Sequence, residues 1–154
     1  MSQDVLLRIQ DDGTYDLEID GADFAAAEGF ETAIPLSLFA DARAPASRVP
    51  EAQRRRGWVG NIATADTGRQ LGSILWLLDQ ARLTQDTVND ARSFARDALR
   101  WAQEDGVVLN GQVDVLRLGV RGTVIAITLT RSDNRTATYS ALWRATDASV
   151  LPNV

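Results

Sequence analysis

The run Thr123-Val124-Ile125-Ala126-Ile127-Thr128-Leu129-Thr130 decides the fold of this chain. Successive side chains of an extended strand point to opposite faces, so Ile125, Ile127 and Leu129 share one face. Smaller side chains, most of them alanine and threonine, occupy the other face. This alternation predicts a strand that is buried mainly on one face.

Two runs of the same character flank this strand, from Val113 to Val120 and from Thr136 to Trp143. Arg121-Gly122 leaves room for a tight connection on one side, and Ser132-Asp133-Asn134-Arg135 for a four-residue connection on the other. Short connections of this kind join antiparallel neighbours. We therefore predict a C-terminal, three-stranded antiparallel meander.

The N-terminal segment has the pattern of a β-hairpin. Val5 to Ile9 is rich in apolar residues, and Tyr15 to Asp20 alternates strictly between apolar and acidic residues. Asp11-Asp12-Gly13 between them is a turn signal, because glycine adopts a positive φ without steric cost. Ala22 to Gly29, a stretch of small and acidic residues, is expected to be a linker.

Helical spacing begins after this linker. Phe30 to Asp41 places apolar residues on one helical face, but Pro35 removes a backbone donor inside it. The helix therefore starts at about Ile34, or residues 30–34 form a separate turn.

Two further helices are predicted. Leu71 to Leu78 is apolar almost all round, which indicates a central, buried helix. The next helix begins at Thr84, whose hydroxyl can cap it, and runs to Gln103, with Gly106 placed to end it in a left-handed turn. Together these elements predict an α+β fold, with about three helices packed on one face of the sheet.

The length of 154 residues fits a single domain spanning residues 1–154. Within it, residues 44–68 contain two prolines and three glycines and show no hydrophobic period. Structureless loops longer than about 12–15 residues are unusual in compact domains unless they are functional. We therefore expect residues 44–68 to form an ordered interaction loop.

Three residue types that carry much of enzyme chemistry are absent: His, Cys and Lys. The chain cannot build a zinc triad, a Ser-His-Asp triad or a disulfide from its own residues. It also cannot form a Schiff base or a phosphate-binding loop that depends on lysine. All 16 basic residues are arginine, either through coding bias or because arginine forks suit permanent interfaces. We expect no cofactor and no metal.

Net charge and hydrophobicity also limit which kinds of partner we expect. A net charge of −5 argues against a nucleic-acid binder, which usually carries a basic surplus. No run of about 18 apolar residues is present, so we expect no membrane span. The N-terminus lacks the basic and apolar segments of a signal peptide, which favours synthesis and assembly in the cytoplasm.

Candidate contact residues gather in the predicted loop. Arg54, Arg55 and Arg56 precede Trp58. Three basic residues in an acidic chain are a weak signal for phosphate binding, and a contact with a neighbouring subunit explains them better. Because Trp and Arg dominate interface hot spots, Trp58 is either an interface anchor or a plug at the edge of the protein's own core.

A second candidate is a column of like charge on the last helix. Arg92, Arg96 and Arg100 are spaced four residues apart, so they lie on one helix face. They form either a solvated face with local ion pairs, for example to Asp97, or a ladder that binds an acidic strip on a partner.

If the protein were a hydrolase, Glu28 and Glu31 would be its candidate catalytic carboxylates. A glycosidase needs two carboxylates about 5–9.5 Å apart, one of them in an apolar pocket. The sequence indicates no such pocket, and the helix dipole already explains acids near a helix start. We therefore expect no enzymatic activity.

Three blocks of the sequence, in their order and spacing, carry a resemblance to a known family. They are Phe30 to Arg43, Arg54 to Asn61 with Gly72 to Leu78, and Leu99 to Gly106. In this order they resemble the baseplate wedge family of Mu-like contractile-tailed phages. That family is akin to the small, lysozyme-like wedge protein of T-even phages, which starts the tail sheath.

The resemblance implies a structural virion protein of the tail baseplate, present in sixfold copies. It implies a helical bundle shared with the larger baseplate wedge proteins and contact with the central hub or spike. It also implies a β-sheet platform on which the first ring of tail sheath protein is built. The expected location is the virion, after assembly in the host bacterial cytoplasm.

The T-even relatives carry Glu-Pro-Arg just after the long helix, facing the wedge core. The matching place here reads Glu104-Asp105-Gly106, so the resemblance carries over only Glu104 as a contact residue. Two alternatives to a baseplate subunit stay open: a small carboxylate-dependent cell-wall hydrolase, and a generic cytoplasmic adaptor domain.

Overall fold

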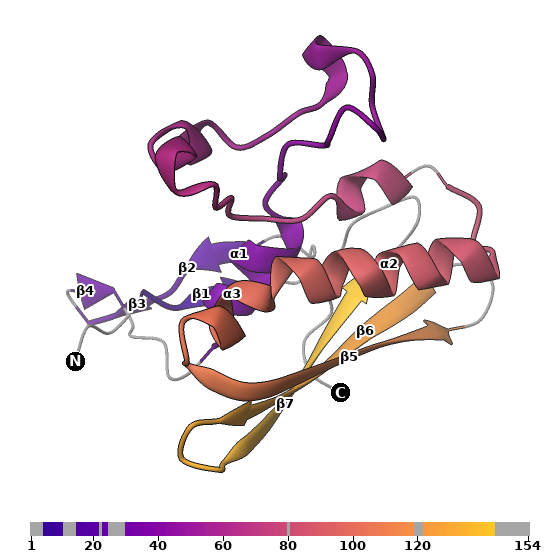
Figure 1. Cartoon of the computed structure of the whole chain (residues 1–154). Helices are drawn as coiled ribbons and strands as arrows, with labels where there is room; N and C mark the ends of the chain where they lie inside the picture. The colour runs from indigo at the N-terminus through magenta and orange to yellow at the C-terminus, as the bar shows by residue number, and fades with distance from the viewer. Residues whose placement is uncertain are drawn as a thin grey trace.

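The computed structural model describes residues 5–10, 15–21, 23–24, 30–79, 81–118 and 122–143. Its largest sheet is antiparallel, in the order β5-β6-β7, with the strands Val108–Leu118, Gly122–Arg131 and Thr136–Trp143. Helix α2 (Gln85–Ala98) lies across one face of this sheet (Figure 1). The predicted α+β fold, with helices on one face of a C-terminal meander, is confirmed.

The sheet buries one face, as the alternation in β6 predicts. The buried residues of the three strands are Val108, Val113, Val115, Thr123, Ile125, Ile127, Leu129 and Ala141. They share a face because the register pairs Val113 with Ile127 and Val115 with Ile125. On the other face, residues of β6 are only half-buried, so the sheet has an inner and an outer side.

Small residues let α2 pack closely on the inner side. Ala91 and Ala95 are fully buried in the core that α2 shares with the sheet, and β5 is the strand that α2 contacts most. Phe30, Leu38 and Leu75 reach the same core from the preceding segments. Because each fully buried large apolar side chain contributes about 1.5–3 kcal/mol, this one cluster supplies most of the driving force for folding.

The two ends of the long helical segment follow its local sequence. Thr84 Oγ1 accepts a hydrogen bond from the Thr87 N–H at 3.2 Å, which confirms the predicted cap. At the other end Gly106 has a φ of 70°, and its N–H donates to the Gln103 carbonyl. The Val107 N–H donates to the Ala102 carbonyl, which completes a Schellman motif and confirms Gly106 as the stop.

The prediction of one uninterrupted helix up to Gln103 is wrong. α2 ends at Ala98, and a separate short helix, α3 (Arg100–Glu104), follows. At the break, the Leu99 N–H donates to the carbonyls of both Ala95 and Arg96. Such a shared donor tightens the turn locally and lets α3 take a new direction while Leu99 stays buried.

Helix α1 (Ala33–Phe39) starts where Pro35 allows it to start. Pro35 is the third helical residue, and the first turn of a helix has no internal partner for its N–H groups. The missing donor of Pro35 therefore removes no bond within Ala33–Phe39. The N–H groups on either side of it, of Ile34 and Leu36, donate to the carbonyls of Phe30 and Thr32 ahead of the helix.

The prediction of a buried helix over Leu71 to Leu78 is wrong in its length and type. Only Leu75–Leu78 are helical, as a four-residue 3-10 helix, η4. Upstream, the Ser73 N–H donates to the Ala40 carbonyl at 2.9 Å, and the Ala42 N–H donates to the Ser73 carbonyl at 2.9 Å. This bridge occupies the backbone before η4, so a longer helix cannot form.

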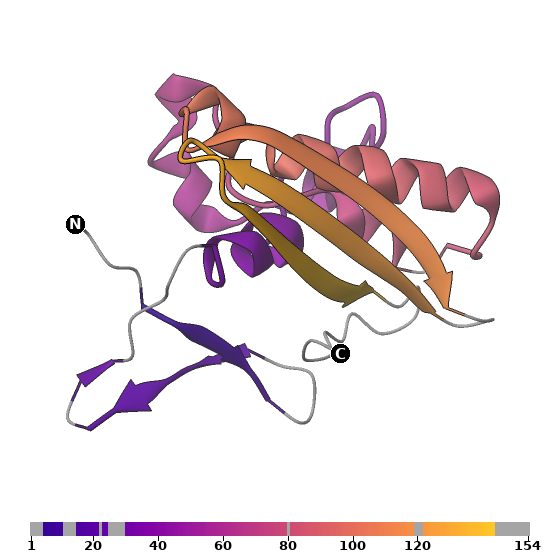
Figure 2. The same cartoon turned by 90° about the horizontal axis from the view of Figure 1, so that it is seen from below.

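The N-terminal hairpin is confirmed and is followed by a second one. β1 (Leu7–Ile9) pairs with β2 (Tyr15–Leu17), and β3 (Ile19–Asp20) pairs with β4 (Asp23–Phe24), both antiparallel. The segment Tyr15 to Asp20, predicted as one strand, is divided between β2 and β3, and β4 lies in the stretch predicted as a linker. The Asp11-Asp12-Gly13 turn lies outside the described residues. Figure 2 shows both hairpins extending away from the helices and the large sheet.

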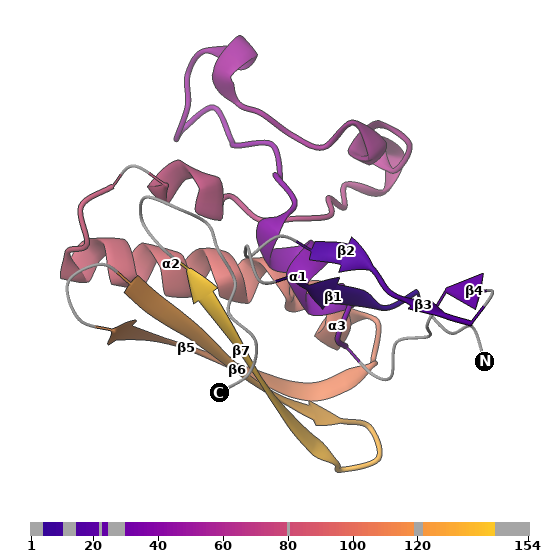
Figure 3. The ribbon, with the colours of Figure 1, turned by 180° about the vertical axis from the view of Figure 1, so that it is seen from behind.

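The loop over residues 44–68 has a defined path on the side of α2 that faces away from the sheet (Figures 1 and 3). It contains three 3-10 helices: η1 (Ala52–Arg54), η2 (Val59–Ile62) and η3 (Ala65–Thr67). The Asn61 side chain donates to the Leu71 carbonyl at 3.0 Å and accepts from the Leu71 N–H at 2.8 Å. An ion pair of 2.7 Å joins Arg69 to Asp105 at the end of α3.

Gly72 is the residue on which the bridge before η4 depends. Its φ is 104°, and an added Cβ would lie 2.2 Å from the Ala40 carbonyl oxygen. Gly72→Ala should therefore lower the free energy of unfolding in urea by about 2–4 kcal/mol. The control Gly68→Ala, at a φ of 68° with no atom near its Cβ, should cost about 1 kcal/mol. Equal losses in the two variants would contradict this role for Gly72.

Candidate interaction surfaces

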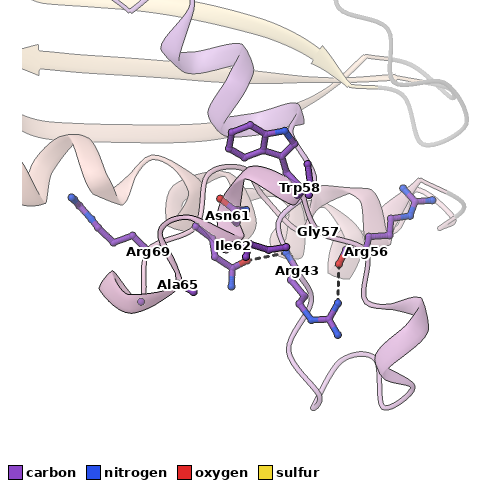
Figure 4. Close-up of a pocket in the computed structure, with 11 residues that line it drawn as sticks. Arg43, Arg56, Gly57, Trp58, Asn61, Ile62, Ala65 and Arg69 are labelled. Carbon is purple, nitrogen blue, oxygen red and sulfur yellow. Dashed lines mark hydrogen bonds between the residues drawn. The ribbon is translucent and has the colours of Figure 1, made fainter.

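The loop presents an apolar surface beside a pocket of about 400 Å³. Trp58, Val59 and Ile62 are 49%, 74% and 75% exposed, and we call these three residues the η2 surface. All three also line the pocket, together with Arg43 and Arg56 (Figure 4). Clustered apolar side chains that remain in water are typical of surfaces that another molecule covers.

Trp58 is held by contacts with its own loop and with the segment before it. The backbone N–H of Trp58 donates to the Asp41 carbonyl at 2.8 Å. The indole lies so close to Gly60 that an added Cβ there would be 2.1 Å from the ring. The ring is half exposed and lies outside the buried core cluster, which disfavours the explanation as a core plug. Its role as an interface anchor stays a prediction.

The three consecutive arginines do not form one basic patch. Arg55 donates to the carbonyl oxygens of Val49 at 2.8 Å and Pro50 at 2.9 Å. Arg54 is exposed, and its side chain makes no hydrogen bond or ion pair with any residue that the structure describes. Each of these arginines therefore has a different environment, although they are neighbours in sequence.

Arg56 joins the loop to the helical layer. It lies 3.5 Å from the Asp41 carboxylate and 3.8 Å from the Asp79 carboxylate, and its guanidinium stacks 4.7 Å from the centre of the Trp76 ring. Burial raises the pKa of Asp79, Arg56 opposes that rise, and the nearby Asp41 adds to it. Arg56 thus holds two carboxylates together that would otherwise repel each other.

The arginine column on the helices is likewise split by its surroundings. Arg92 is half-buried, and its Nε lies 3.7 Å from Asp114 on β5, a distance that suits an ion pair but not a hydrogen bond. Arg100 pairs with Asp97 three residues earlier. Arg96 is exposed, and its side chain forms no hydrogen bond or ion pair within the described part of the chain. Of the three, Arg96 is therefore the one most available to a partner.

Glu104 ends α3 and is exposed to solvent. Arg69, at the end of the loop, lies 3.7 Å from the Glu104 carboxylate and 2.7 Å from that of Asp105. Glu104 keeps room for a second contact, because an exposed carboxylate can accept several hydrogen bonds.

Most residues on the outer side of the sheet are small or polar. They are Gln112 and Asp114 on β5, Ala126, Thr128 and Thr130 on β6, and Thr136, Thr138 and Ser140 on β7. Leu116, which is 56% exposed, and its partner Val124 add apolar side chains to this side. Seen from below, no described helix or strand lies over it (Figure 2). Another layer can be placed on this side of the sheet.

The ladder between β6 and β7 leaves a row of β7 backbone groups without a strand partner among the described residues. The Arg131 N–H donates to the Arg135 carbonyl at 2.8 Å, which fixes the first bonded pair of the hairpin. Bonded and non-bonded pairs alternate along an antiparallel ladder, so Thr136, Thr138 and Ser140 turn their N–H groups away from β6. Among the described residues, no strand pairs with this edge.

Three observations concern enzyme chemistry and membranes. Glu31 is exposed in the turn before α1, and Glu28 lies outside the described residues. The described residues contain no cluster of acidic, His or Cys side chains suited to a metal ion. None of the described helices combines the length and the apolarity required to cross a bilayer.

The family model described as "Phage protein GP46" matches residues 30–136, from the start of the helices through β6. This chain belongs to the GP46 family of phage proteins. The baseplate protein gp46 of Escherichia phage Mu is 36% identical over 121 residues, which cover 76% of this chain and 81% of that protein. The predicted resemblance to the baseplate family of Mu-like phages is confirmed, while the kinship with T-even phages stays a prediction.

A second relative of this GP46 family member is the FluMu protein gp46 of a Mu-like prophage in Haemophilus influenzae. It is 29% identical over 133 residues, which cover 85% of this chain and 91% of the relative. No solved structure matches significantly.

Sequence reasoning missed Arg43, Val59, Ile62 and Arg69 as surface or loop-fixing residues. Val59 and Ile62 had a usable signal, since they are apolar residues in a loop without a hydrophobic period. Arg43 and Arg69 had none, because their partners are distant in sequence.

The unequal surroundings of Arg92 and Arg96 lead to a test. Arg92→Glu would place a carboxylate beside Asp114 in a half-buried site, and should lower the free energy of unfolding in urea by about 1–3 kcal/mol. Arg96→Glu, on the same helix face, should change that energy by less than about 0.5 kcal/mol. If the two reversals prove equally costly, Arg92 is not tied to the sheet.

Proposed function

We propose that this chain is a structural, non-enzymatic subunit of a phage tail baseplate. It joins the larger baseplate wedge proteins and provides a β-sheet platform for the first ring of tail sheath protein in a contractile tail. Membership in the GP46 family and the baseplate name of the Mu relative support the baseplate assignment. Several copies, six in a complete baseplate, surround the central hub or spike.

The observation that carries the platform role is the open β7 edge. An unpaired strand edge is a template for a strand from another chain, and soluble proteins usually protect such edges with charge, proline or bulges. Thr136 to Ala141 contains no charged residue and no proline. A sheath arm that adds here would gain backbone hydrogen bonds for register and side-chain contacts for selectivity.

A second region serves attachment to the larger wedge proteins. Arg96 and Arg100 lie on the exposed side of the helices, and Glu104 closes α3 nearby in sequence. We assign these residues, with the η2 surface, to contacts inside the baseplate. The sheet edge is thereby left for the sheath.

The hydrolase and adaptor alternatives receive no specific support. Glu31 is solvent-exposed rather than held in an apolar pocket, and such a pocket is what raises the pKa of a glycosidase acid. The family relationship favours a virion component over an unrelated adaptor. We place the protein in the tail baseplate, after assembly in the host cytoplasm.

The edge mechanism predicts the effect of a proline on β7. Thr138→Pro removes an N–H that points away from β6, so the protein's own ladder keeps its hydrogen bonds. The variant should fold and enter baseplates, whereas sheathed tails, counted by electron microscopy in a phage complementation assay, should be nearly absent.

The matched control is Thr138→Val, which keeps the N–H and the β-branched shape. It should support sheathed tails at the wild-type number. Thr136→Pro tests the same edge if Thr138→Pro unfolds. Normal sheath assembly with a folded proline variant at either position would rule out strand addition at β7.

A further inference from the structure

Charge is distributed very unevenly along this chain. Residues 1–31 contain nine acidic residues and one arginine, which gives a net charge of −8. Residues 41–70 contain six arginines and three acidic residues, which gives +3. The remaining residues are neutral in sum. An acidic N-terminal arm and a basic loop therefore occur in the same molecule.

The basic charge of the loop is not neutralised from within. Arg43 donates to the carbonyl oxygens of Arg56 at 3.2 Å and Ala52 at 3.0 Å, and it pairs with no carboxylate among the described residues. Arg55 is likewise bound to carbonyl oxygens, and the Arg54 side chain has no polar partner in the described chain. Three arginines thus keep an unpaired positive charge. Arg43 lines the pocket beside the η2 surface and donates to Ala52 of η1, the short helix that Arg54 ends.

The acidic arm carries the complementary pattern. Tyr15 to Asp20 alternates apolar and acidic residues, and Ile19 is 67% exposed. Asp16 and Asp20 are exposed, and neither forms an ion pair with a described residue. The arm therefore offers an apolar side chain between carboxylates, which fits a surface where apolar side chains lie between arginines.

In the folded chain, the described residues of the acidic arm and of the basic loop of one copy form no hydrogen bond or ion pair with each other. The hairpins extend away to one side of the body, and the loop rises from the far side of α2 (Figures 2 and 3). A contact between two different patches, one on each copy, is heterologous. It continues from copy to copy and forms a ring where the rotation between copies closes, and an open filament where it does not.

We propose that copies of this chain associate head to tail, with the segment Tyr15 to Asp20 (β2 and β3) of one copy bound to the η2 surface, Arg43 and Arg54 of the next. The apolar contact joins Ile19 to Val59 and Ile62, and the arm carboxylates pair with Arg43 and Arg54. The inference deepens the proposed function, since it supplies contacts between neighbouring copies in a baseplate, but its test uses the isolated chain.

The test is sedimentation velocity of the full chain over a concentration series. The average mass of the wild type should rise with concentration, with a dissociation constant on the order of 10–100 µM, and this rise should weaken with added salt. Two variants each remove one side of the contact: Ile19→Ser with Asp20→Arg in the arm, and Ile62→Ser with Arg54→Glu in the loop. Each alone should stay monomeric.

Mixing the two variants is the decisive step. The arm variant keeps an intact loop and the loop variant keeps an intact arm, so the mixture should form 1:1 dimers and nothing larger. Arg135→Glu, a charge reversal at an exposed turn outside both patches, should associate like the wild type. Circular dichroism checks that all variants fold.

Three results would overturn the inference: a wild type that stays monomeric to about 1 mM, variants that associate like the wild type, or a mixture that stays monomeric. Incorporation of the variants into baseplates is a separate readout. If the variants fail the mixing test while the protein still enters baseplates, the head-to-tail contact is wrong and the proposed function stands.

Discussion

The structure depends on the mutual burial of α2 and the inner side of the β5-β6-β7 sheet. Ala91 and Ala95 have no exposed surface, so the helix lies close to the sheet. Ile125, Ile127 and Leu129 of β6 are buried beneath it. One side of the sheet is thereby committed to the core, and the opposite side is left to solvent. The loop follows the other side of α2 (Figure 1). Its residues Trp58, Val59 and Ile62 lie outside the core and stay exposed.

Sequence predicted those parts of the fold whose cause is local. The β7 strand begins and ends at the predicted residues, because β-branched residues and a short turn define both limits. Thr84 and Gly106 act as predicted, since a cap and a left-handed stop need only the residues of one helix end. The alternation in β6 also predicted which face is buried, because the period of a strand is fixed.

Sequence could not predict the parts whose cause lies elsewhere in the chain. Leu71 to Leu78 has the apolar content of a buried helix. However, the backbone N–H and carbonyl of Ser73 are bonded to Ala40 and Ala42, so they are not available for helical hydrogen bonds. Arg92, Arg96 and Arg100 are equivalent by spacing, but only Arg92 has Asp114 of β5 within reach. The same limit applies to the loop, whose path is set by the bonds of Asn61 to Leu71 and of Arg69 to Asp105.

We propose separate surfaces for separate partners: the sheet edge for the sheath, and the helices and loop for the baseplate. In this proposal β7 is completed by a strand from another chain. A high-resolution map of an assembled tail that contains this protein would show whether that strand is present. We expect an extended segment of a sheath subunit hydrogen-bonded along Thr136 to Ser140. A map in which that edge is free, or is covered by the protein's own chain, would contradict it.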